Sequence, residues 1–273
     1  MSDSPSTAGT AEPEVRYETR GPVAVVTLNR PQVLNSFTRS MHATLQAILA
    51  RVQDDRSVRA LVLTGAGRGF CAGLDLSELD FTPGPDLLER VNPGPLLETC
   101  FNPTARALMN LRVPTVAAVN GVAAGAGVSL ALTCDLVVAA PTASFVQAFS
   151  KIGLIPDAGG SWLTVQRLGL ARALGLALLG DRLSAQQARD WGMIWDVADD
   201  PLAAALALAE RLAAMPTQAL VATRALLRGA PQRSFETQLQ AEGEWQSALG
   251  RTHDYVEGVT AFLQKRPPQF KGE

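Results

Sequence analysis

The chain has 273 residues, of which 47% are hydrophobic and 18% are charged, and its formal net charge is −2. This length and composition predict a globular protein made of one large domain, or of a core domain with an appendage. The nearly balanced charge contains no block of like charges, so neither nucleic acid nor a membrane surface is expected as a partner.

The N-terminal residues 1–14 are polar and rich in Ser, Thr and Pro, and are predicted to form a disordered tail. They lack the basic start and apolar run of a signal peptide, and no window is long and apolar enough to span a membrane. The three cysteines, Cys71, Cys100 and Cys134, have no metal-binding spacing. We therefore expect a cytoplasmic protein with reduced thiols and no metal.

Strand and helix patterns alternate over residues 15–200. Apolar runs predict buried strands at Val23–Leu28, Ala60–Thr64, Pro114–Asn120 and Asp135–Ala140. Helical spacing is found over Ser36–Asp54, Asn102–Leu111 and Val128–Thr133. The segment Asp80–Pro103 is rich in proline and is predicted to be an irregular excursion, the usual place for a pocket lid.

The second half of the chain is mostly helical. Trp162–Leu179 is predicted to be a helix with Gly180 as its C-cap, and Ser184 is predicted to cap a short helix that stops at Gly192. Residues 201–273 are expected to be helical almost throughout. The fold class is therefore α/β, with a β/α core over residues 15–200 and a helical C-terminal region over residues 201–273.

Two glycine-rich loops follow predicted strands. Cys71-Ala72-Gly73-Leu74 lies after one strand, and Gly125-Ala126-Gly127 lies after another and directly before a helix. Backbone amides at such a loop and helix start have no intrahelical partner, so two of them can converge on one ligand oxygen as an oxyanion hole. The glycines can equally serve only tight turns and close packing.

Other common site types are poorly supported. The loop at Gly65–Gly67 has Phe70 where a dinucleotide-binding pattern requires a third glycine, and no Walker sequence follows. The two histidines, His42 and His253, do not lie in a glycine-rich loop, and no nucleophile elbow is present.

Asp157 is the one acid in the run from Phe145 to Trp162, which consists mostly of apolar and small residues. It precedes Ala158-Gly159-Gly160 and a predicted helix, so it can be a helix N-cap. It can also be a general base in an apolar pocket, which we expect to be lined by Phe145, Phe149, Ile152, Leu154 and Ile155. Burial would raise its pKa and the helix start would lower it.

Several motifs together resemble the crotonase, or enoyl-CoA hydratase/isomerase, superfamily. The similar stretches are Leu28–Thr38, Gly67–Leu76, Pro114–Ala140, Phe149–Gly169, Gly180–Ile194 and Ala261–Phe270. They occur in the family's order and cover nearly everything after residue 15. The resemblance implies a spiral of ββα turns, a homotrimer or dimer of trimers formed through residues 201–273, and an acyl-CoA thioester as substrate. It implies no separate cofactor, because coenzyme A is part of the substrate.

The resemblance also implies roles for individual residues. It places the oxyanion hole at the amides of Leu74 and Ala126 and the catalytic acid/base at Asp157. The residues expected to line the substrate or coenzyme A site are Arg30, Leu34, Ser36, Ala72, Gly73, Asp75, Gly125, Phe149 and Lys265. Lys265 is similar to a family residue that meets the coenzyme A phosphates, often across a subunit boundary.

The chain departs from the family pattern at the two glutamates with which hydratases add water. They fall at Ser129 and Phe149 here, whereas Asp157 stands where hydratases have glycine. The combination is similar to isomerases of the family, and most of all to those that convert ring-1,2-epoxyphenylacetyl-CoA to an oxepin. A shift of an enoyl-CoA double bond from position 3 to 2 is a related expectation. The alternatives are an enoyl-CoA hydratase and a non-catalytic acyl-CoA-binding or scaffold protein.

Overall fold

The computed structural model describes residues 12–273, and its larger sheet has six strands in the order β1-β2-β3-β5-β7-β10. These strands are β1 (Val15–Arg20), β2 (Val23–Leu28), β3 (Ala60–Gly65), β5 (Thr115–Val119), β7 (Leu136–Ala139) and β10 (Asp196–Val197). The edge pair β1–β2 is antiparallel and the other pairs are parallel. Val- and Ala-rich strands suit this arrangement because β3 and β5 are buried along almost their whole length.

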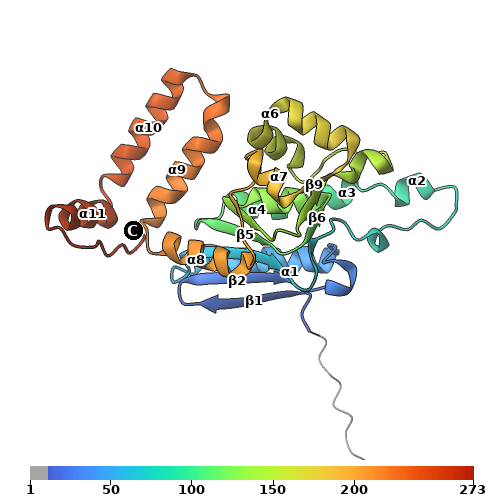
Figure 1. Cartoon of the computed structure of the whole chain (residues 1–273), viewed down its shortest axis with the longest axis horizontal. Coiled ribbons are helices and arrows are strands. Elements are labelled where there is room, and N and C mark those ends of the chain that lie inside the picture. The colour runs from blue at the N-terminus through green and yellow to red at the C-terminus, as the bar shows by residue number, and fades with distance from the viewer. Residues whose placement is uncertain (1–11) are drawn as a thin grey trace, which may run out of the picture.

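A smaller sheet follows the order β4-β6-β8-β9. Its strands are β4 (Gly69–Cys71), β6 (Val122–Ala124), β8 (Ser144–Val146) and β9 (Arg182–Ser184). Strands β3, β5 and β7 of the large sheet are each followed in sequence by a short strand of the small sheet. The chain therefore forms a spiral of successive turns, each of which contributes one strand to each sheet (Figure 1). The predicted α/β class and spiral of turns are confirmed.

The helices cover the sheets and form the C-terminal region. They are α1 (Arg39–Asp54), α2 (Leu87–Arg90), α3 (Gly94–Leu96), α4 (Asn102–Met109), α5 (Ala126–Thr133), α6 (Gly160–Leu179), α7 (Ala185–Asp190), α8 (Pro201–Ala213), α9 (Thr217–Gly229), α10 (Phe235–Leu249) and α11 (His253–Leu263). Four short 3₁₀ turns are η1 (Pro31–Val33), η2 (Leu76–Glu78), η4 (Ala148–Ile152) and η5 (Ala230–Gln232), and η3 (Leu97–Phe101) is a π-helical turn.

The predicted helix ends are partly confirmed. Gly180 is the left-handed C-cap of α6, and the Ser184 hydroxyl caps α7 by accepting the Gln187 amide. Helix α1 begins at Arg39, three residues later than predicted, because Thr38 is its N-cap and accepts the Met41 amide.

Helix α8 belongs to the core, although the sequence placed residues 201–273 in a separate helical region. Its alanines Ala205, Ala209 and Ala213 are buried against the outward face of the large sheet, which includes Val25 and Val62. Small residues at this spacing let the helix backbone approach the strands closely. The part that projects from the core therefore begins with α9 (Figure 1).

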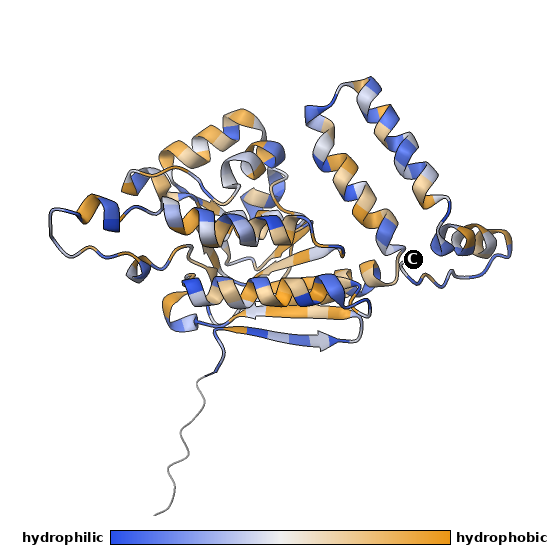
Figure 2. Cartoon of the chain, turned by 180° about the vertical axis from the view of Figure 1, so that it is seen from behind, coloured by the Kyte–Doolittle hydropathy of each residue, from blue (hydrophilic) through white to orange (hydrophobic). Residues whose placement is uncertain are grey.

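Figure 2 shows the contrast between the two regions: the central strands are apolar, whereas the projecting α10 is largely hydrophilic. The described residues of α10 include none that is buried. The projecting helices keep several large apolar side chains in solvent, among them Phe235, Phe262 and Leu263.

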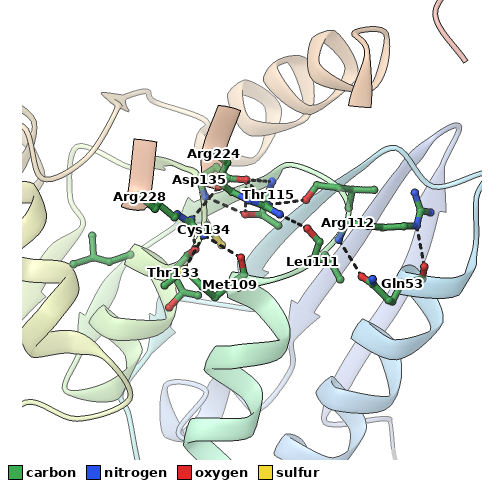
Figure 3. A network of polar contacts seen from close by, with 12 residues as sticks. Gln53, Met109, Leu111, Arg112, Thr115, Thr133, Cys134, Asp135, Arg224 and Arg228 are labelled. Atoms are coloured by element: carbon green, nitrogen blue, oxygen red, sulfur yellow. Dashed lines mark hydrogen bonds and ion pairs between the residues drawn. The ribbon is translucent and has the colours of Figure 1, made fainter. Parts of the chain in front are cut away.

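The second half of α9 is tied to the core by Asp135 (Figure 3). One carboxylate oxygen pairs with Arg224 at 3.1 Å and the other with Arg228 at 2.9 Å. Arg228 also donates to the main-chain carbonyls of Met109 and Thr133, the last residues of α4 and α5, and Arg224 donates to the Val113 carbonyl. The network thus joins three helices at one point.

Residues 1–11 of the predicted tail lie outside the described residues. The last three residues of the predicted tail, 12–14, contact the core, since the Glu14 carbonyl accepts the Asn29 amide at 2.7 Å and its carboxylate pairs with Arg30. The predicted irregular segment, Asp80–Pro103, is helical from Gly94 onward, which proline permits at the first turn of a helix. Within residues 12–273, no helix is long and apolar enough to cross a membrane.

Replacing Asp135 with Asn should lower the free energy of unfolding by roughly 2–3 kcal/mol, because two partly buried guanidinium groups lose their counter-charge. Urea denaturation measures this change. Asp196→Asn is the matched control, because its pair with Arg189 is about half exposed and its loss should cost no more than about 0.5 kcal/mol. Equal effects of the two substitutions would contradict the role given to Asp135.

Candidate functional site

The loop before α1 adopts an uncommon backbone conformation at two successive residues. Leu34 and Asn35 have φ values of 52° and 57°, in the left-handed region that Asn tolerates better than most residues. The buried Asn35 amide donates to the carbonyls of Ala66, Gly69 and Phe70 at 2.8–3.2 Å. Its side-chain oxygen accepts the Arg30 amide at 2.8 Å. Asn35, which the sequence analysis did not single out, therefore joins the loop before α1 to residues 66–70, which lead into the glycine-rich loop Cys71–Leu74.

A second connection between these loops is ionic. Arg30 pairs with Asp75 at 2.7 Å and donates to the Ser36 carbonyl at 2.9 Å, while the Ser36 hydroxyl contacts Asp75 at 3.2 Å. Burial disfavours the charged carboxylate, but hydrogen bonds from Arg30 and Ser77 outweigh burial and lower the pKa of Asp75 to about 2. Three of the residues expected at the coenzyme A site are thus held together as a unit.

The glycine-rich loop lies directly against the start of α5. A Cβ atom added to Gly73, whose φ is +89°, would come within 3.0 Å of the Ala124 carbonyl oxygen and 3.2 Å of the Ala126 nitrogen. A Cβ atom added to Gly127 would lie only 2.2 Å from the Cys71 carbonyl oxygen. The glycines therefore serve close packing, and this packing brings the glycine-rich loop against the Ala126 amide, as the predicted oxyanion hole requires.

The neighbours of Leu74 fix the direction of its amide. Phe37 donates to the Gly73 carbonyl at 2.7 Å and accepts the Asp75 amide at 3.0 Å in a parallel bridge. Since alternate residues of an extended chain point to opposite sides, the Leu74 amide points away from Phe37. Ala126 is the first residue of α5, so its amide has no intrahelical partner. These are the donors that an oxyanion hole requires.

Phe149 packs against the turn before α5. Gly125 has φ 53° and ψ −128°, a conformation that glycine adopts without strain, and a Cβ atom added to it would lie 3.6 Å from the end of the Phe149 ring. Phe149 itself is 7% exposed. An apolar ring therefore borders the predicted oxyanion hole at a position where the family pattern has a glutamate in hydratases.

Asp157 is not the N-cap of α6, which corrects one of the two alternatives. Ala158 takes a left-handed conformation with φ 49°, and the helix begins after Gly159, its N-cap, without a side-chain cap. Among the described residues, the Oδ1 atom of Asp157 is buried and has no hydrogen-bond partner. Burial raises the pKa of Asp157 to about 6, opposed only by its own backbone amide. A carboxylate with this pKa suits proton transfer near neutral pH.

Ser129 connects Asp157 to α5. Its hydroxyl donates to the Asp157 carbonyl at 2.8 Å. Ser129 lies three residues after Ala126, on the same face of α5 and about 4.5 Å along the axis. Ala126 and Ala158 also line one small cavity. The acid and the predicted oxyanion hole are thus adjacent, with α5 as their common support.

The expected apolar pocket around Asp157 is only partly formed. Phe145 and Phe149 are buried, but Ile152, Leu154 and Ile155 are 63%, 42% and 79% exposed in the single chain. Gly153 ends η4 in a left-handed turn, after which Leu154 and Ile155 are directed outward. The prediction that these three side chains line the pocket is wrong for the isolated chain.

The remaining predicted residues fall into two groups. Leu34 and Ala72 lie in the two connected loops, where the Ala72 amide donates to the Leu34 carbonyl at 2.9 Å. Lys265 follows α11 with φ 54° and is exposed on the projecting helices. The single chain does not bring it to the other residues, and its proposed contact across a subunit boundary stays a prediction.

Thiol chemistry is not favoured by the geometry. Burial raises the pKa of the Cys71 thiol to about 12, so it stays protonated despite its place in the glycine-rich loop. Within residues 12–273 no cluster of His, Cys, Asp or Glu has the arrangement of a metal site.

A family model described as enoyl-CoA hydratase/isomerase matches residues 18–273. The chain belongs to the enoyl-CoA hydratase/isomerase family. It is 51% identical to the 1,2-epoxyphenylacetyl-CoA isomerase of Escherichia coli K12 over 92% of this chain and 95% of that protein. It is 37% identical to the 2,3-dehydroadipyl-CoA hydratase of the same organism, over 92% and 95% of the two chains.

Solved structures of the enoyl-CoA hydratase/isomerase family have the same fold. The crystal structure of enoyl-CoA hydratase from Bacillus anthracis matches with a TM-score of 0.87 at 30% identity, over 96% of this chain and all of that chain. The similarity to the family therefore includes both the core and the C-terminal helices.

The contact between Ser129 and α6 gives a sharp test of how Asp157 is held. A Cβ atom added to Gly160 would lie 2.3 Å from the Ser129 hydroxyl oxygen but 3.4 Å from its Cβ atom. Gly160→Ala alone should therefore destabilise the protein by about 1–3 kcal/mol. In a Ser129→Ala background the same change should cost much less, because the obstructing oxygen is gone.

A double-mutant cycle by urea denaturation measures this coupling. Gly175→Ala, at a helical glycine with nothing within 4 Å of an added Cβ atom, is the control for the effect of alanine itself. Additive effects of the Ser129 and Gly160 substitutions would contradict the contact.

Proposed function

We propose that this protein is a coenzyme A thioester isomerase that converts ring-1,2-epoxyphenylacetyl-CoA to the corresponding oxepin. The observation that carries the proposal is the partly buried carboxylate of Asp157, whose Oδ1 atom has no hydrogen-bond partner among the described residues, near the predicted oxyanion hole of Leu74 and Ala126. The 51% identity to the Escherichia coli isomerase supports the choice of acyl group. A shift of the double bond of an enoyl-CoA from position 3 to position 2 would use the same groups.

In the proposed mechanism the thioester carbonyl oxygen accepts hydrogen bonds from the Leu74 and Ala126 amides. These bonds stabilise the enolate that forms when a proton leaves the carbon next to the carbonyl. Asp157 takes that proton and returns it elsewhere on the conjugated system, so it acts first as base and then as acid. The reaction moves a proton and rearranges bonds, so it requires no cofactor besides the coenzyme A of the substrate.

Hydration is the alternative reaction. Two-carboxylate addition of water would need acids at Ser129 and Phe149, and instead Ser129 holds the Asp157 carbonyl and Phe149 presents a ring beside Gly125. The ring keeps water away from the reacting carbons in this proposal. Isomerisation is therefore favoured over hydration.

The assembly and location are part of the proposal. We propose a homotrimer or dimer of trimers in the cytoplasm, in which the projecting helices α9–α11 contact neighbouring subunits. The exposed apolar side chains of α10 and α11, including Phe235 and Phe262, support such contacts. Lys265 would then reach the coenzyme A of a neighbouring subunit.

Asp157→Asn should lower kcat for isomerisation by about 10²–10⁴-fold, because it keeps the shape of the side chain and removes the base. In the wild-type protein kcat/KM should fall about tenfold per pH unit below pH 6 and level off above it, because the base must be ionised and the pKa of Asp157 is about 6. Steady-state assays with the ring epoxide and with 3-hexenoyl-CoA measure both effects.

The same assays separate the competing functions. Near-wild-type turnover by Asp157→Asn would contradict the mechanism, and rapid hydration of crotonyl-CoA by the wild type would favour the hydratase. Binding of acyl-CoA without any turnover would indicate a non-catalytic family member. The variant should remain folded, and its melting temperature at pH 8 should equal or exceed that of the wild type, because a buried unpaired charge is removed.

A further inference from the structure

A small cavity lies between the predicted oxyanion hole and the Asp157 turn. Its volume is about 10 Å³. It is lined by residues of α1 and the loop before it, of η3, α4 and α5, and of the turn before α6, namely Phe37, His42, Phe101, Thr104, Ala105, Ala126, Leu130 and Ala158. A space of this size holds about one oxygen atom, such as that of a water molecule.

His42 is the buried titratable group at this cavity, and it is held on several sides. Its ring stacks on Phe37 with centroids 4.4 Å apart and meets the edge of Phe101 at 4.2 Å. Its Nδ1 atom lies 2.8 Å from the Thr104 hydroxyl oxygen. Only 3% of the residue is exposed to solvent.

The Nε2 atom of His42 is different. It is buried and has no hydrogen-bond partner among the described residues. Leaving a buried polar atom without a partner costs about 1–3 kcal/mol. Nδ1 contacts Thr104 and the ring face stacks on Phe37. We therefore infer that His42 lines the cavity with the ring edge that carries Nε2.

We propose that His42 Nε2 and this cavity form a subsite for one neutral oxygen substituent on the acyl group of the substrate. The proposal rests on the proposed function, because it assumes that the thioester carbonyl lies at Ala126. Ala126 and Ala158 both line the cavity, so an acyl group bound at Ala126 would lie beside it. The cavity would then accommodate one further oxygen atom of that acyl group. A ring oxygen or a hydroxyl group has the required size and polarity.

The charge state of His42 fits a neutral ligand. Burial lowers the pKa of His42 to about 4, so the imidazole is uncharged at neutral pH. An uncharged ring does not pair with Asp157 and does not disturb its titration. It offers one hydrogen bond of moderate strength without a desolvated charge.

The surrounding hydrogen bonds allow Nε2 to act as donor or acceptor. The Thr104 hydroxyl lies 2.9 Å from the Cys100 carbonyl and also contacts His42 Nδ1, and Gln46 donates to both that carbonyl and the hydroxyl. When Thr104 donates to Cys100, Nδ1 carries the ring proton and Nε2 accepts from a hydroxyl group. When Thr104 donates to Nδ1, Gln46 satisfies the carbonyl and Nε2–H donates to an ether-type oxygen.

The π-helical turn η3 builds one wall of the subsite. It supplies Phe101 and the Cys100 carbonyl, and it directly follows α3. Such turns interrupt the regular hydrogen bonding of a helix and occur often at functional sites. The wall that contacts the substituent is thus part of the segment, Asp80–Pro103, that we predicted to be a pocket lid.

Binding of two unreactive thioesters tests the subsite. Isothermal titration of the wild type with 2-hydroxyphenylacetyl-CoA and phenylacetyl-CoA should give about tenfold tighter binding of the hydroxylated ligand, the effect of one buried hydrogen bond. His42→Gln keeps an amide near the Nε2 position and should retain a preference. His42→Asn keeps only the group near Nδ1 and should bind both ligands equally.

Unchanged binding of phenylacetyl-CoA by both variants is the control for folding. Equal affinity of the wild type for the two ligands would overturn the subsite and indicate a cavity that holds only water. A preference that persists in His42→Asn would overturn the role of His42. If the wild type binds neither thioester, both the proposed function and the subsite are contradicted. If it binds both thioesters with equal affinity, only the subsite is contradicted.

Discussion

The close approach of the Gly73 loop to the first turn of α5 is the contact on which the site depends. It exists because Gly73 and Gly127 have no side chains, and any Cβ atom there would collide with backbone of the opposite segment. All eight residues of α5 are buried, so the helix cannot shift to relieve such a collision. At the other end of the helix, Arg167 donates to the carbonyls of Leu132 and Cys134, which complements the helix dipole and fixes the helix along its axis.

The ionised carboxylate of Asp157 lowers the stability of the folded protein, and the same property makes it a better base. Its raised pKa means that the folded state prefers the protonated acid, so this group stabilises the protein fully below its ordinary pKa of 3.8. That contribution is lost as the pH rises through about 6. At neutral pH the carboxylate is therefore a partly desolvated charge without a partner, which is costly for folding and useful for a base. Ser129 holds the main chain of Asp157 and leaves its carboxylate free.

Much of the architecture could be predicted because it depends on local pattern. Valine-rich runs predicted the parallel strands. Ser184 and Gly180 predicted the ends of two helices, because capping involves only residues close in sequence. The end of α6 nearest Asp157 was different, because Ala158 takes a left-handed conformation that its sequence does not signal. That single residue moves the helix start and decides that Asp157 is not a cap.

Other features depend on contacts between distant segments. Asn35 and His42 have ordinary neighbours in sequence, and their roles arise from three carbonyls 31–35 residues away and from a hydroxyl 62 residues away. The exposure of Leu154 and Ile155 likewise follows from how η4 ends, which hydrophobic composition alone does not predict. A family resemblance supplied the pairing of Leu74 with Ala126, and only the fold explains why Gly73 permits it.

The central claim is that Asp157 and the two amides form one enolate-stabilising site. Exchange of protons for deuterium on a ligand that has no epoxide to rearrange tests this claim. Phenylacetyl-CoA in D₂O, followed by NMR, should exchange the protons next to its carbonyl in the presence of the wild type. Asp157→Asn should bind the same ligand and leave those protons in place. Exchange at the wild-type rate in Asp157→Asn, or none with the wild type despite binding, would contradict the account.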